Sequence, residues 1–427
     1  MVARFAVIQL GARMRYAVPQ IFHAAGMLEC FYTDLWANHV WLRALRLLPT
    51  RLQPGALRRL TSRGSDAMDI PNEKIRSFPL VGFRYALRRH RARTADELTR
   101  AHFAAGDALS RCVLGTGLGD ATHCYVFGVA SLELMRAVAG SKTFVMEQMI
   151  APHSVLCKLL ALEREKHLDW ESCESAGTMD ELIMARYREA WSRADIIVCG
   201  SEFVREGIRR CAGPVSKCIV VPYGVDFGDS QLKDQQWRRS VTDQRHARRR
   251  AGEPLRVLSV GAIDLRKGAP YVLEAARALE GRARFRMVGA MDVAQDAAAR
   301  LAEHVELLGQ VPRNEVQQHY RWADVFLLPS VCEGSATVTY EALAYGLPVI
   351  CTPNTGSVVR DGVDGLIVEP SSGEAVIAAI ERVIADPDLW LSMAEAAFVT
   401  SDQNDVKHYG ERLLRAVGCD PGALSRI

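Results

Sequence analysis

The sequence predicts an α/β fold with two domains, each built around a mainly parallel sheet. Strand-like segments alternate with helical ones through most of the 427 residues, which is typical of this fold class. Many of the strand-like segments are continuous apolar runs, which indicates that helices cover both faces of the sheet. A polar, charge-rich stretch near the middle of the chain separates two such series, so we expect two domains.

Apolar runs locate the strands, and helical periodicity locates the helices between them. We expect five strands in each half of the chain. Clear helical patterns follow in the second half, at Ala269–Leu279, Val293–His304 and Glu374–Ala385. The expected strands are Arg4–Leu10, Cys124–Ala130, Thr143–Gln148, Asp195–Cys199, Cys218–Val221, Arg256–Val260, Arg284–Val288, Val305–Leu308, Asp324–Leu328 and Pro348–Cys351.

The domain boundary is expected in the polar stretch between Asp226 and Glu253, which has little apolar periodicity. We predict a first Rossmann-like domain over residues 1–228, a polar linker over 229–253 and a second Rossmann-like domain over 254–388. A ligand is then expected in the cleft between the domains, at the carboxyl ends of the strands.

The composition narrows the class of protein. Hydrophobic residues make up 49% and charged residues 24%, which excludes a disordered chain, a collagen-like repeat and a small disulfide-rich scaffold. A net charge of +3 is low for a generic nucleic-acid binder, and no apolar run approaches the roughly 18–20 residues that span a bilayer. The eleven cysteines contain no C-x-x-C pair, so we expect reduced thiols in a cytoplasmic protein and no zinc site.

Residues 41–100 are unusually basic, with 14 Lys or Arg side chains against 5 Asp or Glu. Trp and Leu residues are mixed with arginines in and just before the first part of this segment. One interpretation is a basic amphipathic surface that contacts the inner face of an anionic membrane or a charged acceptor. The other, which composition alone favours, is a solvated Arg-rich surface.

The most informative stretch is Phe326–Gly346, where an apolar strand leads through a short loop into a helix expected from about Ala336 to Tyr345. The start of a helix presents unpaired backbone N–H groups and the positive end of the helix dipole. Gly334 and Ser335 are small and leave room for an anion to approach. The pattern therefore predicts a phosphate site at this helix start.

Two glutamates flank this helix start. Glu333 precedes the helix, and Glu341 follows eight residues later on its second turn. At 1.5 Å per residue they lie at most about 12 Å apart along the helix, which is too far for a shared proton. A carboxylate accepts two hydrogen bonds from a sugar diol, so the pair suits one extended ligand with hydroxyl groups at both ends. For each residue alone, the alternative is a helix cap or a solvated helical Glu.

A basic pair, Arg266 and Lys267, lies in the loop that follows the expected strand Arg256–Val260. This loop opens at the carboxyl end of a strand, where α/β proteins bind their ligands. A planar Arg and a flexible Lys together can neutralise a diphosphate. An exposed basic pair without function is the alternative.

These residues lie within segments that resemble a family 4 (group 1) retaining glycosyltransferase of the GT-B fold, in which two Rossmann-like domains face a cleft. The resemblance covers nearly the whole chain. Its best-known signature is a pair of glutamates separated by seven residues, as at Glu333 and Glu341. The segments that carry it are 194–208, 220–226, 260–268, 323–350 and 361–370.

The resemblance implies that a nucleotide sugar binds the second domain as a substrate, with no cofactor and no metal ion. Glu341 would hold the ribose and Glu333 would contact the donor sugar. The diphosphate would be bound, and the departing charge stabilised, by the backbone N–H groups of Gly334, Ser335 and Ala336 together with Arg266 and Lys267. The loop that contains Gly309 and Val311 would lie near the base.

The first domain would bind the acceptor, a glycan, a lipid-linked molecule or a small molecule. The resemblance implies that Gly11, after the first strand, lies near the donor phosphates and that His153 faces the donor sugar. It also implies that C-terminal helices from about residue 389 to 427 pack back on the first domain. Many family members carry Arg after the glycine at position 261, where this chain has Ala262, and Arg266 would then supply that charge.

Two other functions remain open at this point. The same fold serves nucleotide-sugar epimerases and phosphorylases, and a degenerate site would give a non-catalytic nucleotide-sugar-binding protein. The expected location is the cytoplasm, with the membrane contact of the basic segment as an open alternative.

Overall fold

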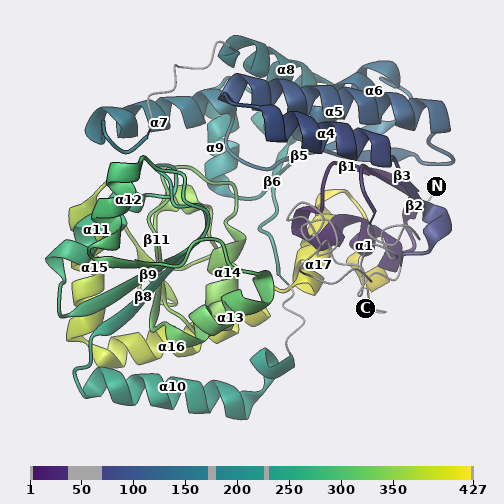
Figure 1. The fold of residues 1–427 in the computed structure, drawn as a ribbon. Helices are drawn as coiled ribbons and strands as arrows, with labels where there is room; N and C mark the ends of the chain where they lie inside the picture. The colour runs from purple at the N-terminus through teal and green to yellow at the C-terminus, as the bar shows by residue number, and fades with distance from the viewer. Residues whose placement is uncertain (1–2, 37–69, 172–178, 226–229, 425–427) are drawn as a thin grey trace, which may run out of the picture.

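The computed structural model confirms the predicted α/β class and contains two parallel sheets (Figure 1). It describes residues 3–36, 70–171, 179–225 and 230–424. The two sheets belong to two units that lie side by side, one in each half of the chain. Among the described residues, no helix combines the length and the apolar character needed to cross a bilayer.

The first sheet has seven parallel strands in the order β3-β2-β1-β4-β5-β6-β7. Strand β1 reads FAVIQ and is buried along its whole length, as expected for a strand covered on both faces. Strand β1 has β2 on one side and β4 on the other. The order in which strands are added to the sheet therefore reverses between β1 and β4. The strands are β1 Phe5–Gln9, β2 Leu28–Thr33, β3 Ile75–Ser77, β4 His123–Phe127, β5 Thr143–Gln148, β6 Ile196–Cys199 and β7 Cys218–Val220.

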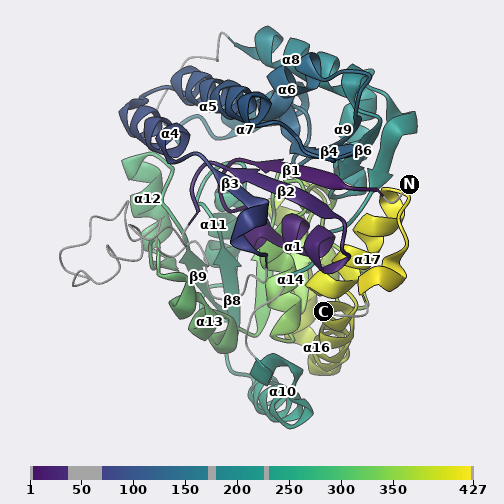
Figure 2. The same ribbon diagram turned by 90° about the vertical axis from the view of Figure 1, so that its right-hand side faces the viewer.

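Helices pack on both faces of the first sheet (Figures 1 and 2). One face is covered by α5 Ala95–Thr116, α6 Leu132–Ala137 and α8 Asp180–Arg193, with α4 Pro79–Arg91 against α5. The other face is covered by α1 Ala17–Ala24 and by α17 Val406–Ala416, from the far end of the chain. The other α-helices in the described part of this unit are α7 His153–Lys166 and α9 Glu202–Arg210.

The second sheet has six parallel strands in the order β10-β9-β8-β11-β12-β13. Strand β8 lies between β9 and β11, so this sheet has the same kind of reversal point between β8 and β11. The strands are β8 Leu255–Val260, β9 Ala283–Val288, β10 Val305–Leu307, β11 Val325–Leu328, β12 Val349–Cys351 and β13 Gly365–Ile367.

The helices of the second unit form one apolar core on each face of its sheet. The first core joins the strands to α11 Ala269–Ala278, α12 Gln295–Ala302, α15 Gly373–Ala385 and part of α16 Pro387–Asp402. The second core joins them to α13 Arg313–Trp322 and α14 Thr337–Ala344. Trp390 of α16 is fully buried and donates a hydrogen bond from its indole N–H to the carbonyl oxygen of Asp324 at 2.8 Å.

The ten predicted strands are all present, with ends that differ by at most three residues, and Thr143–Gln148 matches at both ends. Three further strands, β2, β3 and β13, were not predicted. The strands β3, which reads IRS, and β13, which reads GLI, are short and contain polar residues or a glycine, so neither forms a clear apolar run. Strand β2 begins with Leu-Glu, and its polar second residue interrupts the apolar run.

The segment predicted as a polar linker contains a helix, α10 Gln235–Arg250, which packs on α16. Arginines of this helix take part in its packing. Arg245 is buried and donates hydrogen bonds to the carbonyl oxygens of Tyr345 and Tyr320. Helix α16 therefore packs in the second unit, and α17 packs on α1 in the first (Figure 1).

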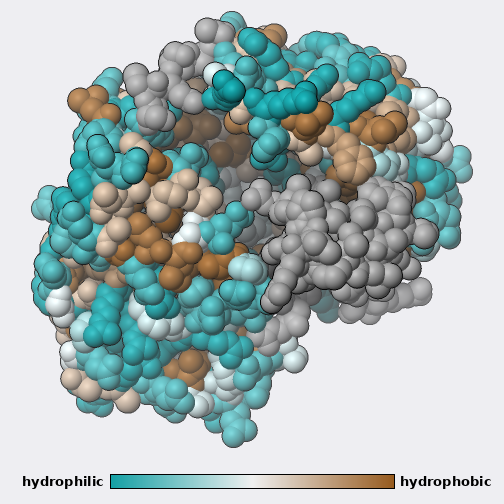
Figure 3. Space-filling view, in the orientation of Figure 1, coloured by the Kyte–Doolittle hydropathy of each residue, from teal (hydrophilic) through white to brown (hydrophobic). Residues whose placement is uncertain are grey.

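The carboxyl ends of the two sheets face each other. The loop after β6 contacts the loop after β11, where the hydroxyl of Ser201 donates to the carbonyl oxygen of Gly334 at 2.5 Å. In Figure 3 the surface is hollowed between the two units, and hydrophobic residues line part of the recess. This is the cleft in which the sequence places a ligand.

Candidate active site

Two loops of the second unit build the candidate site. Residues 261–268 follow β8, and residues 329–336 follow β11. Since β8 and β11 are neighbours at the reversal point of the sheet, both loops open at the same edge. The fold therefore brings together the basic pair and the glutamate that the sequence analysis selected separately.

Glu333 accepts hydrogen bonds from both cations of the basic pair. One oxygen, Oε1, lies 2.6 Å from Nη1 of Arg266 and 2.6 Å from Nζ of Lys267. The side chains of Glu333 and Lys267 are each 13% exposed, and that of Arg266 is 25% exposed. At this level of burial the three charges interact more strongly than at an open surface.

Asp264 holds the loop of the basic pair in place. Its Oδ1 accepts from the backbone N–H of Lys267 at 2.7 Å, and its Oδ2 lies 3.8 Å from Nη2 of Arg266. Burial raises the pKa of the Asp264 carboxyl above its usual value. Burial acts against the charge of Arg266, but Glu333 and Asp264 outweigh it and raise the pKa of the guanidinium, which stays charged.

Gly261 allows the Lys267 side chain to fold over the end of β8. Its φ is +141°, and a Cβ at this position would lie 2.7 Å from Cε of Lys267. A side chain there would push the ammonium away from Glu333. The following residue is Ala262. Many members of the family that the sequence resembles carry Arg at this position, whereas in this chain Arg266 lies beside Glu333.

The start of helix α14 offers backbone donors to the cleft. Among the residues that the structure describes, the N–H groups of Gly334, Ser335, Thr337 and Val338 have no hydrogen-bond partner. The N–H of Ala336 differs from expectation, because it donates to the carbonyl oxygen of Thr355 at 3.2 Å. Four unpaired N–H groups beside two cations form a site for an anion.

Contacts within the protein explain the small residues at 334 and 335, and for Gly334 the contact is with the first unit. A Cβ on Gly334 would lie 1.8 Å from the carbonyl oxygen of Met149, in the loop after β5. Ser335 is buried, and its hydroxyl pairs with the phenol of Tyr340 at 2.7 Å. The missing side chain of Gly334 thus makes room for the first unit rather than for a ligand.

Glu341 lies on α14 and is held by the neighbouring helix. Its Oε2 accepts from the hydroxyl of Tyr320 on α13 at 2.8 Å. The Tyr320 ring stacks on Tyr345, with ring centres 5.2 Å apart and an angle of 9° between planes. This support fixes the direction of the Glu341 carboxylate, as a binding residue requires.

Gly309, Val311 and Gly11 lie in loops at the carboxyl ends of strands. Gly309 follows β10 with φ +63°, and its carbonyl oxygen accepts from the N–H of Gly289 at 2.9 Å. Val311 packs beside the apolar cluster that contains Ala336. Gly11 follows β1 with φ +73°, and its N–H donates to Oδ1 of Asp34 at 2.8 Å.

His153 is the first residue of α7, and the two side chains that it contacts by hydrogen bonds belong to the first unit. Its Nε2 lies 2.7 Å from Oδ1 of Asp180 and 3.3 Å from Sγ of Cys157. No contact between the imidazole and the cluster around Glu333 is found among the described residues. The structure thus places His153 on the first-unit side of the cleft, separate from the basic pair.

Sequence reasoning did not select several residues that shape the site. Asn354 and Thr355 accept hydrogen bonds from the N–H groups of Glu333 and Ala336. Asp264 lies between strand β8 and the basic pair. Its place in the same loop is a sequence signal that could have identified it as part of the site. Asn354 and Thr355 make these contacts with their backbone carbonyl oxygens. Every residue type has such an oxygen, so the sequence gives no sign of the contacts.

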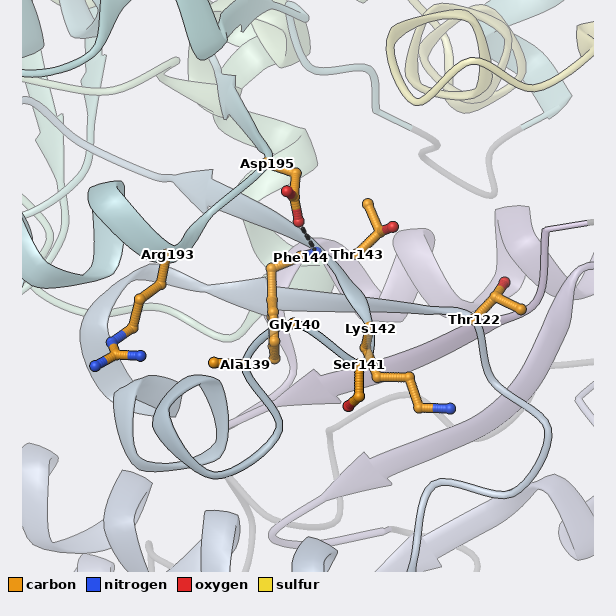
Figure 4. Close-up of a pocket in the computed structure, with 9 residues that line it drawn as sticks. All are labelled: Thr122, Ala139, Gly140, Ser141, Lys142, Thr143, Phe144, Arg193 and Asp195. Atoms are coloured by element: carbon orange, nitrogen blue, oxygen red, sulfur yellow. Dashed lines mark hydrogen bonds between the residues drawn. The ribbon is translucent and has the colours of Figure 1, made fainter.

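A separate cavity of about 430 Å³ lies at the opposite edge of the first sheet (Figure 4). It is lined by residues before β4, β5 and β6, among them Lys142, Arg193 and Asp195. The carboxylate of Asp195 accepts from the N–H of Phe144 at 2.7 Å, and Nζ of Lys142 donates to the carbonyl oxygen of Ala121 at 2.5 Å. Since these groups are used within the fold and lie away from the cleft, we assign no function to this cavity.

Comparison with known proteins supports the assignment of the second unit. Residues 254–386 match the family model described as glycosyl transferases group 1. The D-inositol 3-phosphate glycosyltransferase of Geodermatophilus obscurus is 34% identical over 195 residues, 40% of this chain and 41% of the relative. The GDP-mannose-dependent alpha-(1-6)-phosphatidylinositol monomannoside mannosyltransferase of Mycolicibacterium smegmatis is 28% identical over 231 residues, 50% and 59% of the two chains.

The chain thus spans about half the length of the curated relatives that it matches. The solved structure of Anabaena Alr3699/HepE in complex with UDP aligns with 97% of this chain and with 99% of the chain in that structure. The TM-score is 0.60 and the sequence identity is 13%. At that identity the likeness concerns the fold, and it extends over both units. Residues 254–386 thus resemble the group 1 glycosyl transferases, and the described chain has the two-domain fold predicted from the sequence.

Proposed function

We propose that this protein is a retaining glycosyltransferase that moves a sugar from a nucleoside diphosphate to a glycan, a lipid-linked molecule or a small molecule, without a metal ion. The observation that carries the proposal is the cluster of Arg266, Lys267 and Glu333 beside the unpaired N–H groups at the start of α14. Such an arrangement stabilises the negative charge that develops on a departing diphosphate. The UDP bound in the solved neighbour and the GDP-mannose in a relative's name agree with a donor of this kind.

In this proposal each part of the site has one task. Lys267, Arg266 and the α14 N–H groups hold the diphosphate, Glu341 binds the ribose hydroxyls, and Glu333 contacts the donor sugar. Gly309 and Val311 lie toward the base. Gly11 approaches the phosphates from the first unit, and His153 faces the sugar. An acceptor that attacks from the same side as the leaving diphosphate preserves the configuration of the anomeric carbon.

Donor choice and reaction type can be tested together. Thermal unfolding with UDP, GDP and ADP sugars identifies the donor, because a ligand that binds only the folded state raises the melting temperature. Product analysis with that donor then separates the alternatives. A transferase releases nucleoside diphosphate only as the sugar moves, an epimerase releases none in a net reaction, and a phosphorylase requires phosphate. Binding without turnover would indicate a non-catalytic protein.

Retention and metal independence need their own measurements. The anomeric configuration of the product, followed by nuclear magnetic resonance, is expected to match that of the donor. Turnover in the presence of excess EDTA is expected to equal turnover without it, because two cations and a helix start supply the positive charge at the diphosphate. Inversion, or a rate that collapses with EDTA and recovers with a divalent ion, would contradict this part of the proposal.

Glu341→Ala is expected to weaken donor binding. Hydrogen bonds to a charged group are worth about 1.5–3 kcal/mol, so we expect the donor KM to rise about 10- to 100-fold. Steady-state kinetics with varied donor measures this change. The matched control is Glu395→Ala, which removes an exposed glutamate from α16 in the same unit. An unchanged donor KM in Glu341→Ala would contradict the ribose assignment.

The described part of the basic segment suggests how a lipid-linked acceptor is reached. Residues 41–69 of that segment lie outside the described residues. On α4, Leu80, Phe83 and Leu87 share one helix face and are 72%, 43% and 49% exposed, while Val81 on the opposite face is buried. Exposed arginines of α4 lie around this apolar face, at Arg84, Arg88 and Arg91. An apolar stripe flanked by cations suits the surface of an anionic membrane.

The triple variant Leu80→Ser, Phe83→Ser, Leu87→Ser is expected to lose membrane binding. Flotation with vesicles that contain phosphatidylserine, at low salt, is expected to recover the unmodified protein and not the variant. The control, Leu114→Ser with Leu162→Ser, removes exposed leucines from α5 and α7 and is expected to float normally. If the unmodified protein fails to float, the membrane contact and the peripheral location are wrong, and the solvated-surface interpretation stands.

A further inference from the structure

Three side chains capable of binding a metal ion meet where helices α7 and α8 begin. His153 and Cys157 lie four residues apart on one face of α7, and Asp180 is the first residue of α8. Their ligand atoms lie within 4.8 Å of one another, the one such group found among the described residues. None of the three belongs to the cluster around Glu333.

The arrangement differs from a proton relay. In a Cys–His–Asp relay the thiol and the carboxylate contact opposite nitrogens of the imidazole. Here both lie near the same nitrogen, Nε2, at 3.3 Å for Cys157 Sγ and 2.7 Å for Asp180 Oδ1. Three groups that converge on one point are what a bound ion requires.

The distances fit an ion at that point. Cys157 Sγ lies 3.9 Å from Asp180 Oδ1, which completes a triangle with sides of 2.7, 3.3 and 3.9 Å. The centre of a circle through its corners lies about 2.0 Å from each atom, and zinc binds nitrogen, oxygen and sulfur at about 2.0–2.3 Å. An ion slightly out of the plane therefore reaches all three atoms with shifts of a few tenths of an ångström.

The type of ligands selects the metal. An imidazole, a thiolate and a carboxylate together suit zinc, whereas magnesium and calcium prefer oxygen ligands alone. The Asp180 side chain is 49% exposed, which leaves a path for entry.

We propose that His153, Cys157 and Asp180 bind one zinc ion, with a fourth position open to water. The lack of a C-x-x-C pair led us to expect no zinc site from the sequence. The ligands proposed here have a different pattern: a His-x-x-x-Cys spacing and Asp180, 23 positions after the cysteine. The site lies outside the cluster of Arg266, Lys267 and Glu333, for which we propose no metal. It uses His153, which the proposed function turns toward the sugar, so bound zinc and that role of His153 exclude each other.

Metal binding to the full chain tests the proposal without any assay of activity. Protein stripped with a chelator and then dialysed against zinc is expected to retain one ion per chain. Cobalt in place of zinc is expected to give the near-ultraviolet absorption of a cobalt–thiolate bond. Cys157→Ser and Asp180→Asn are each expected to weaken binding at least about ten-fold, as the loss of a ligand does. Cys112→Ser, which removes another partly buried thiol, is the control and is expected to bind normally.

Two results would overturn the proposal. One is cobalt binding without thiolate absorption in the unmodified protein, a measurement that does not depend on any variant folding. The other is equal zinc binding by the unmodified protein and by Cys157→Ser, with circular dichroism showing both to be folded. Zinc held with equal strength by every variant would mean that other thiols or imidazoles bind it.

Discussion

Lys267→Ala is expected to lower the rate of sugar transfer by about 10²- to 10³-fold, the effect of removing one group that stabilises charge in a transition state. The ammonium lies 2.6 Å from Oε1 of Glu333 and is largely buried, so its loss removes one of the two cations beside this carboxylate. Since this charge acts mainly as the diphosphate departs, the change is expected in kcat more than in the donor KM.

The matched control for this experiment is Arg277→Ala, which removes an exposed cation from α11 in the same unit. Its kcat is expected to equal that of the unmodified protein. Lys267→Arg is expected to recover part of the activity, because the charge returns with a different shape. Equal kcat values for Lys267→Ala and the unmodified protein would refute the role of the basic pair, and with it the proposed site.

Gly334→Ala is expected to lower the rate of sugar transfer about 100-fold because it changes how the two units are arranged. A displacement of about 1 Å in an active site can lower a rate by this factor. The added methyl group would lie 1.8 Å from the carbonyl oxygen of Met149 and 3.2 Å from the Cα of Ile150. Both are backbone atoms, so the loops after β5 and β11 must separate. That separation also strains the hydrogen bond from Ser201 to Gly334.

Small-angle X-ray scattering can distinguish this cause from simple unfolding. Gly334→Ala is expected to keep its circular dichroism spectrum and to show a larger radius of gyration than the unmodified protein. The control is Gly115→Ala on α5, where an added methyl group meets no atom within 4 Å. Normal activity and an unchanged radius in Gly334→Ala would show that the loops adapt without cost.

The interior strands were predictable because burial on both faces demands apolar residues throughout. Strand β11, which reads VFLL, is buried at every position and needs no tertiary information to be recognised. Edge strands such as β3 and β13 have three residues each, and what defines them is their pairing with β2 and β12 rather than their composition. Helix α10 was missed because buried arginines such as Arg245 and Arg238 replace the usual apolar face.

The core of the candidate site followed from the sequence because parallel strands place their loops at one edge. Arg266, Lys267 and Glu333 each follow a strand, and the order of the strands makes their meeting predictable. Contacts between the units were not predictable in this way. Ser201 and Gly334 are 133 positions apart and meet only because the two sheets face each other. The partnership of His153 with Asp180 depends likewise on how α7 and α8 pack.

The position of α17 has a consequence for how the chain is made. Tyr409, Leu413 and Leu414 belong to the same apolar core as Phe5 and Val7 of β1. Strand β1 therefore completes its packing only after residues 409–414, far later in the chain, have been synthesised. Until they leave the ribosome, one face of the first sheet is exposed to chaperones and to neighbouring nascent chains, even though domains in general fold as they emerge.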